Sequence, residues 1–127
     1  EAAESLGISN YHVGITATTS DFYAGQSRSA KASMFRMEDL LPILQKAGVL
    51  NFEMETATLY TLASLYGLRA GSICAVYANR CTNEFKEGAG EEDAIKIANE
   101  ATRILFEWDA KKRKKKKQWV YPTLLTT

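Results

Sequence analysis

Short apolar segments alternate with amphipathic segments along this chain of 127 residues, and this alternation constrains the fold more than any other feature. The sequence predicts strands over 11–19, 49–53 and 70–79 and helices over 37–48, 55–67 and 91–108. Strands that alternate with helices are typical of an α/β fold with a central, largely parallel sheet.

The predicted elements also indicate that part of the domain is missing. Residues 2–7 read as the end of a helix stopped by Gly7, with no beginning. A sheet of only the predicted strands would be thin and open at both edges. We therefore expect that the front of the domain lies outside this sequence.

Two of the predicted elements have the pattern of buried structure. Segment 55–67 is apolar on nearly every side, which predicts a helix covered all round. Segment 70–79 is a continuous run of small apolar residues, which predicts a strand covered on both faces with Cys74 in the core. His12, the only histidine, falls in the first strand and is predicted to be a core residue.

The composition, 46% hydrophobic and 10% aromatic, indicates a globular protein. No apolar run approaches the roughly 20 residues that span a membrane, and the start lacks a signal-peptide pattern, so a cytoplasmic location is expected. Cys74 and Cys81 lack a metal-like spacing and are predicted to be reduced thiols. With one histidine and no glycine-rich phosphate loop, neither a metal nor a nucleotide cofactor is expected.

Polar clusters follow each predicted strand, and the carboxyl ends of strands are where α/β proteins bind ligands. We expect the clusters to converge on one site, where an aromatic plane, amide and guanidinium donors and carboxylates would suit a nucleoside. The candidate residues are Thr18, Phe22, Gln26, Arg28, Met54, Glu55, Asn79 and Arg80.

Other interpretations of these residues remain open. Glu55 could be an acid stabilised by the helix dipole, with no ligand. Gln26 and Arg28 could lie in a solvated loop, since these residue types are mostly exposed. Met54 could fill the core.

Three segments together resemble the C-terminal half of the uridine phosphorylases, a family of the nucleoside phosphorylase superfamily. They are HVGITATTSDFYAGQSR, GVLNFEMETATLYTLASLYGLRAGSICAVYANR and EEDAIKIANEATRILFEW, and the resemblance covers about residues 2–110. It implies the C-terminal half of a three-layer α/β/α fold with a mixed, largely parallel sheet, over residues 1–110. Residues 111–127 would then be a basic C-terminal extension.

The resemblance implies a pentosyltransferase of pyrimidine nucleoside salvage, which converts uridine and phosphate to uracil and ribose 1-phosphate without a cofactor. By similarity, Gln26 and Arg28 bind the uracil edge and Phe22 packs on the base. Glu55 would hold the ribose 2′-hydroxyl and Met54 would lie against the sugar, with Glu53 in an orienting role. Arg28 and Glu55 would be the catalytic residues, and Thr18 would also contact substrate.

Asn79 and Arg80 stand where purine-cleaving relatives have an aspartic acid, which favours a pyrimidine. The family's phosphate-binding residues lie in its N-terminal half, so we expect the 127-residue chain alone to be inactive. The family also implies a homo-oligomer, a hexamer built from dimers, and hence exposed apolar surface on this part of the protein.

The charge pattern offers a different interpretation, a non-catalytic domain whose lysine-rich tail binds nucleic acid or an acidic partner. The run KKRKKKK at 111–117 holds seven of the sixteen basic residues, whereas all fifteen acids precede it. Because the rest of the chain is acidic, a solvated extension of the last helix is favoured over nucleic-acid binding. Residues 119–122 are predicted to pack back on the body or on a neighbouring subunit.

Overall fold

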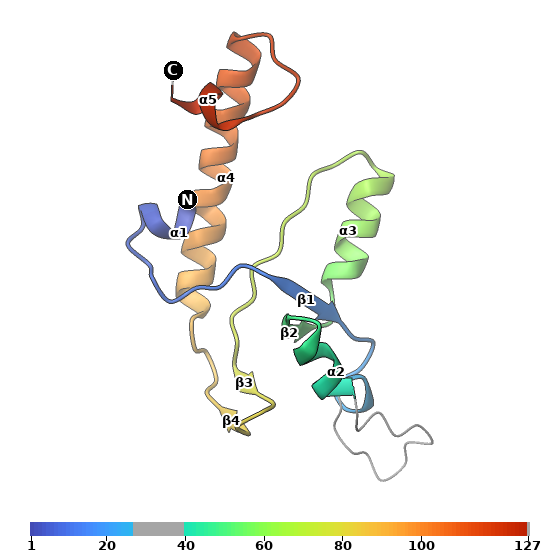
Figure 1. Cartoon of the computed structure of the whole chain (residues 1–127). Helices are drawn as coiled ribbons and strands as arrows, with labels where there is room; N and C mark the ends of the chain where they lie inside the picture. Colours follow the sequence, from blue (N-terminus) through green and yellow to red (C-terminus); the bar gives the residue numbers. More distant parts are fainter. Residues whose placement is uncertain (27–39, 127) are drawn as a thin grey trace. The chain divides into compact units, whose positions relative to one another are not determined.

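Two parallel strands, β1 (Ile15–Thr18) and β2 (Val49–Glu53), form a sheet (Figure 1). Most of the residues predicted to bind a nucleoside lie at or after the carboxyl ends of these strands. The strands belong to a computed structural model that describes residues 1–26 and 40–126. The chain divides into two units, residues 1–11 with 75–127 and residues 12–74. The parallel sheet and the helices of the chain confirm the predicted α/β class.

In the unit of residues 12–74, the predicted second strand is confirmed at 49–53, whereas the first is shorter than predicted. Ile15 pairs with Val49 and Thr18 pairs with Glu53, with an irregularity after Ile15. The ladder ends where β2 ends, because a strand needs a hydrogen-bonded neighbour. His12 therefore precedes β1 and is exposed, so its prediction as a core residue was wrong.

Two helices flank β2 in the sequence. Helix α2 (Leu40–Lys46) ends before Gly48, whose φ of +76° is the left-handed conformation that suits a glycine terminator. Residues 37–39 of the predicted helix lie outside the described residues. Helix α3 (Thr56–Leu65) confirms the prediction over 55–67 in position.

The predicted burial of α3 was wrong. Of its residues only Thr56 and Ala63 are buried, and Leu65 is 75% exposed. A helix that is apolar all round is covered only if the chain supplies neighbours on every side. The exposed apolar surface that the resemblance implied is thus present on α3.

The predicted strand over 70–79 was also wrong for most of its length. Only Ala78–Asn79 forms a strand, β3, which pairs antiparallel with β4 (Glu84–Phe85) in a short hairpin. A buried parallel strand needs partners along its edges. In the described part of the chain the parallel sheet contains β1 and β2 alone. Cys74 and Cys81 form no disulfide in the described residues, and both are exposed, so the prediction of Cys74 as a core residue was wrong.

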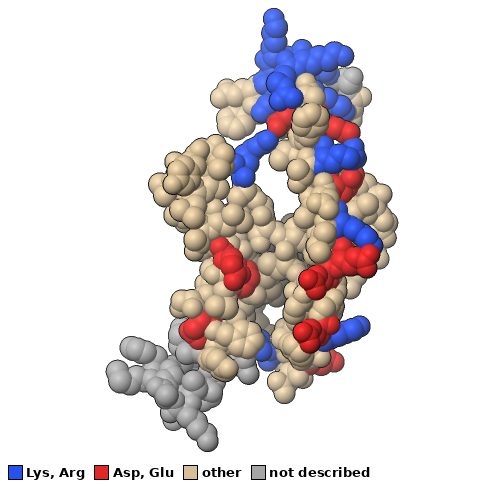
Figure 2. All heavy atoms as spheres, turned by 180° about the vertical axis from the view of Figure 1, so that it is seen from behind, with Lys and Arg blue, Asp and Glu red and all other residues tan. Residues whose placement is uncertain are grey.

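The other unit is organised along the long helix α4 (Glu91–Lys114), which exceeds the predicted helix over 91–108. Its first turn carries Glu91, Glu92 and Asp93, and its last turn carries four basic residues, as the helix dipole favours. Lysine and arginine are good helix formers, which explains the extra turns. Figure 2 shows the basic side chains gathered at this end of α4 and over the segment that follows.

Two short helices pack on α4. Helix α1 (Ala2–Ser5) contributes the buried Ala3, and the Ser5 hydroxyl donates to Glu100 of α4 over 3.3 Å. Helix α5 (Pro122–Leu125) contributes Leu124, which is 2% exposed. Among the helices of the described residues, none has both the length and the apolar character needed to cross a bilayer.

Candidate functional site

The carboxyl ends of β1 and β2 bring Thr18 and Glu53 together, as predicted for neighbouring parallel strands. The Thr18 hydroxyl donates a short hydrogen bond to the Glu53 carboxylate. The same carboxylate accepts from the backbone N–H groups of Glu55, at 2.8 Å, and Thr56, at 2.5 Å. Three hydrogen bonds therefore hold the Glu53 carboxylate at the start of α3.

These contacts decide the charge of Glu53. Partial burial of the carboxyl opposes ionisation, but hydrogen bonds from Thr18, from Thr56 and from the backbone outweigh it and lower the pKa of Glu53 from 4.5 to about 2. Glu53 is thus ionised near neutral pH, and its carboxylate oxygens accept hydrogen bonds from groups of the protein itself.

Glu53 and Thr18 together satisfy the first backbone donors of α3. Glu53 takes the N–H groups of residues 55 and 56, and the Thr18 hydroxyl oxygen accepts from the N–H of Ala57 at 3.0 Å. The buried Thr56 hydroxyl lies 3.0 Å from the Ser72 hydroxyl, which ties the helix start to the segment after α3. The helix start is thus closed by side chains from β1 and β2.

Glu55 occupies the cap position of α3 but makes no cap hydrogen bond with its side chain. Its side chain is exposed, and its Oε2 accepts from the Met54 N–H at 3.2 Å. In the described residues, its Oε1 has no donor. Because Glu53 already caps the helix, Glu55 keeps an acceptor for a ligand.

Met54 lies between the two acids and is 40% exposed, so its alternative interpretation as a core residue was wrong. The strand end therefore presents a carboxylate oxygen and a flexible apolar side chain next to each other. That pair can accept from hydroxyl groups and cover the apolar face of a sugar.

The loop after β1 is shaped by Asp21, a residue that the sequence analysis missed. One oxygen of its carboxylate accepts from the Tyr23 N–H at 2.7 Å and the other from the Gly25 N–H at 3.0 Å. A Cβ on Gly25 would lie 2.9 Å from Asp21 Oδ2, so glycine suits this turn. An aspartate whose side chain accepts from the backbone N–H two residues later is common in turns, and such a residue is a recognisable sequence signal for this kind of loop.

Asp21 thereby positions both predicted base-binding residues in the described part of the loop. The Phe22 ring is 46% exposed and meets the Tyr23 ring edge to face, with centroids 5.8 Å apart. Gln26 ends the short helix η1 (Ala24–Gln26) and is only 6% exposed. The alternative of a solvated loop was wrong for Gln26, and Arg28 lies outside the described residues.

Asn79 and Arg80 belong to the other unit, at the turn between β3 and β4. The Asn79 carboxamide oxygen accepts from the N–H groups of Cys81, at 2.9 Å, and Thr82, at 3.3 Å. Within its own unit, Asn79 therefore shapes this turn. Across residues 1–26 and 40–126, no group of three His, Cys, Asp or Glu side chains could hold a metal ion.

Replacing Asp21 with alanine tests the role of the loop. The variant loses two hydrogen bonds to a charged acceptor, so we expect the free energy of unfolding to fall by about 1–2 kcal/mol. When the same substitution is made in the full-length protein, we expect KM for the nucleoside to rise several-fold with a smaller change in kcat. The reason is that the Asp21 hydrogen bonds fix the loop that carries Phe22 and Gln26. Asp21→Asn keeps one acceptor and should recover part of both effects. Unchanged KM in Asp21→Ala would show that the loop does not hold the base.

Comparison with known proteins shows the family to which the chain belongs. The family model described as Phosphorylase superfamily matches residues 1–108, and the chain therefore belongs to this superfamily. The chain is 54% identical to the uridine phosphorylase of Thermococcus kodakarensis over 124 residues, 96% of this chain and 44% of that protein. It is 39% identical to the uridine phosphorylase of Escherichia coli over 113 residues, 84% of this chain and 44% of that protein.

The resemblance inferred from the sequence motifs is confirmed by these relatives. The chain spans less than half the length of the curated relatives it matches. It is also 40% identical to human uridine phosphorylase 2 over 72 residues, 54% of this chain and 23% of that protein. No solved structure matches the chain.

Proposed function

We propose that this chain forms the nucleoside-binding part of a uridine phosphorylase, which converts uridine and phosphate to uracil and ribose 1-phosphate. The observation that carries the proposal is Glu55, an exposed acid with an available oxygen at the end of β2, in a chain 54% identical to a uridine phosphorylase. Phosphate is a co-substrate, and no cofactor takes part.

The reaction requires two opposite charges to be stabilised. As the glycosidic bond lengthens, the ribose becomes cation-like and the departing uracil carries negative charge. Glu55 accepts a hydrogen bond from the ribose 2′-hydroxyl and so stabilises the cationic sugar. Met54 lies against the sugar, and Glu53 fixes the start of α3 from which Glu55 projects.

The loop after β1 holds the base. Phe22 packs on the uracil ring, and Gln26 and Arg28 bind its polar edge, with Arg28 favouring the departing anion. The burial of Gln26 supports this assignment, because a packed amide keeps one orientation. The Thr18 hydroxyl donates its hydrogen bond to Glu53 and accepts one from the Ala57 N–H, so toward a substrate it can only act as an acceptor, through its remaining lone pair.

We also propose that Asn79 and Arg80, like Gln26 and Arg28, contribute to the choice of a pyrimidine over a purine base. The absence of an aspartic acid at position 79 removes the group that would protonate a purine ring nitrogen. A site built of hydrogen-bond partners rejects a ligand without them by about 10⁴-fold. The preferred substrate is accordingly a pyrimidine nucleoside.

The whole protein is proposed to have the three-layer α/β/α fold, of which residues 1–110 form the C-terminal half. It assembles as a hexamer built from dimers and acts in the cytoplasm. The exposed apolar side chains of α3, Leu59, Leu62 and Leu65 among them, support burial of this helix in the complete assembly.

A spectrophotometric assay of uracil release from uridine tests the function. We expect the full-length protein to show phosphate-dependent release, with kcat/KM for inosine lower by about 10⁴-fold. The polypeptide of 127 residues, assayed beside it, should release no uracil. Failure of the full-length protein would contradict the proposed reaction, and activity of the short polypeptide would contradict the assignment of the phosphate site to another part of the protein.

A further inference from the structure

The C-terminal segment of residues 111–126, which we call the basic tail, is not used by the proposed reaction. The family model ends at residue 108, before the tail begins. Seven of the sixteen basic residues of the chain lie in its first seven positions. Figure 2 shows these side chains as a cluster at the end of α4.

The tail extends α4 only as far as Lys114, where this helix ends and the chain turns. At the end of α4 the N–H of Lys116 donates to the Arg113 carbonyl at 3.1 Å, and the N–H of Lys117 donates to the Lys112 carbonyl at 3.0 Å. This double pattern is a Schellman turn, and Lys116, with φ of +51°, takes the left-handed position that usually holds glycine. A cation thus occupies a position where glycine would be less strained.

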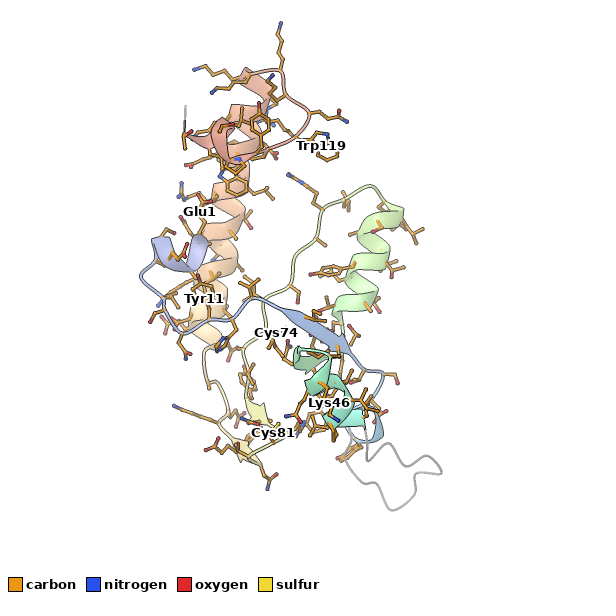
Figure 3. The ribbon with its side chains drawn as sticks, in the orientation of Figure 1. Glu1, Tyr11, Lys46, Cys74, Cys81 and Trp119 are labelled. Atoms are coloured by element: carbon orange, nitrogen blue, oxygen red, sulfur yellow. The ribbon has the colours of Figure 1, made fainter. Side chains whose placement is uncertain are left out.

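After this turn the chain returns to α4. Leu124 of α5 is buried, and the Lys111 ammonium donates to the Leu125 carbonyl at 2.9 Å. Trp119 is 72% exposed and lies in the loop between α4 and α5 (Figure 3), so it does not pack back on the body; packing of residues 119–122 on a neighbouring subunit stays a prediction. Leu124 makes the contact that was expected of Trp119.

Few acids compensate the charge of the tail. Asp109 lies 3.6 Å from Lys112, and Glu107 is engaged by Arg103. In the described part of the chain, no acid pairs with Arg113, Lys114, Lys116 or Lys117. Binding of a polyanion reduces the repulsion among these cations. It is also favoured by the release of the counterions of the polyanion.

We propose that the basic tail binds single-stranded nucleic acid. The lysines and Arg113 contact successive phosphates, and a base stacks on the exposed ring of Trp119, with the 41% exposed Tyr121 close by in the sequence. A single strand is favoured over a duplex because a duplex buries the faces of its bases. The aromatic ring favours a nucleic acid over an acidic protein, for which lysines alone would suffice.

The electrostatic part is tested by the salt dependence of binding to a fluorescent twelve-nucleotide oligouridylate, followed by anisotropy between 50 and 300 mM salt. If about four phosphates are neutralised, the slope of log K against log salt is about −3, from roughly 0.7 per phosphate for a single strand. Arg113→Gln, Lys116→Gly and Lys117→Gln together should reduce the magnitude of the slope by about 2. The glycine preserves the turn.

A matched control removes three cations elsewhere, with Lys46→Gln, Lys86→Gln and Lys96→Gln. It has the same net charge as the tail variant and should keep a slope near that of the unchanged protein. An equal loss in both variants would overturn the proposal, because it would show that net charge and not the tail attracts the RNA.

The stacking part is tested with Trp119→Leu, which keeps an apolar side chain but removes the ring. We expect affinity for the oligouridylate to fall about tenfold at every salt concentration, with an unchanged slope. Absence of binding at 50 mM salt, no effect of Trp119→Leu, or tighter binding to vesicles of phosphatidylglycerol and phosphatidylcholine than to RNA would each overturn the proposal. Glu55→Gln should leave RNA binding unchanged, which separates this test from that of the proposed reaction.

Discussion

Replacing Glu55 with glutamine in the full-length protein is expected to lower kcat/KM for uridine about 100-fold, close to 3 kcal/mol of transition-state stabilisation. Glutamine has nearly the same shape but no charge. It can still accept from a ribose hydroxyl, but it cannot stabilise a cation-like sugar as a carboxylate does. Most of the loss should appear in kcat, because the charge on the ribose develops only in the transition state.

Stability should be nearly unchanged in the same variant. Glu55 is exposed and does not cap α3 through its side chain, so the folded state loses little. Glu87→Gln is a suitable control, since it also removes an exposed acid, but from the other unit. Near-normal uridine kinetics in Glu55→Gln would refute the proposed catalytic role of this carboxylate.

Replacing Glu53 with glutamine is expected to lower mainly the stability of the protein, in contrast to Glu55→Gln. The Glu53 carboxylate receives the Thr18 hydroxyl and two backbone N–H groups, whereas a glutamine must turn its own NH₂ group toward one of these donors. Loss of this cap should lower the free energy of unfolding by about 1–2 kcal/mol, measured by urea denaturation at pH 7. Activity should fall as well, because the position of Glu55 depends on the start of α3.

The pH dependence identifies Glu53 as the cause. Its pKa is about 2 in the folded protein against 4.5 for an ordinary glutamate, so its stabilisation is fully present above pH 4.5 and is lost as the pH falls toward 2. The difference in stability between the unchanged protein and Glu53→Gln should therefore shrink over this range. Glu92 and Glu100 also have lowered pKa values, through hydrogen bonds from Lys96 and Arg103, but they are common to both proteins. A difference that stays constant down to pH 2 would rule out Glu53 as the ionised cap.

Local pattern was sufficient for most elements and for the family. The positions of β2 and α3, the glycine terminators and the polar clusters at the strand ends all follow from short-range preferences and periodicity. The failures concern burial and the pairing of one predicted strand. The strand over 70–79 and the covered helix over 55–67 have sequences suited to neighbours that the described chain does not provide.

The sequence by itself determined that two acids, Glu53 and Glu55, stand where a strand meets a helix, in a chain related to nucleoside phosphorylases. Only the tertiary structure decided which acid is available to a ligand. Thr18 comes from another strand, 35 positions away from Glu53, and its hydroxyl joins the cap of α3 only when the two parallel strands lie in register. The hydrogen bond from Thr18 depends on this long-range pairing, which no local pattern encodes, whereas those from the N–H groups of residues 55 and 56 are local. Glu53 thus binds the start of α3, and Glu55 keeps a carboxylate oxygen without a donor among the described residues.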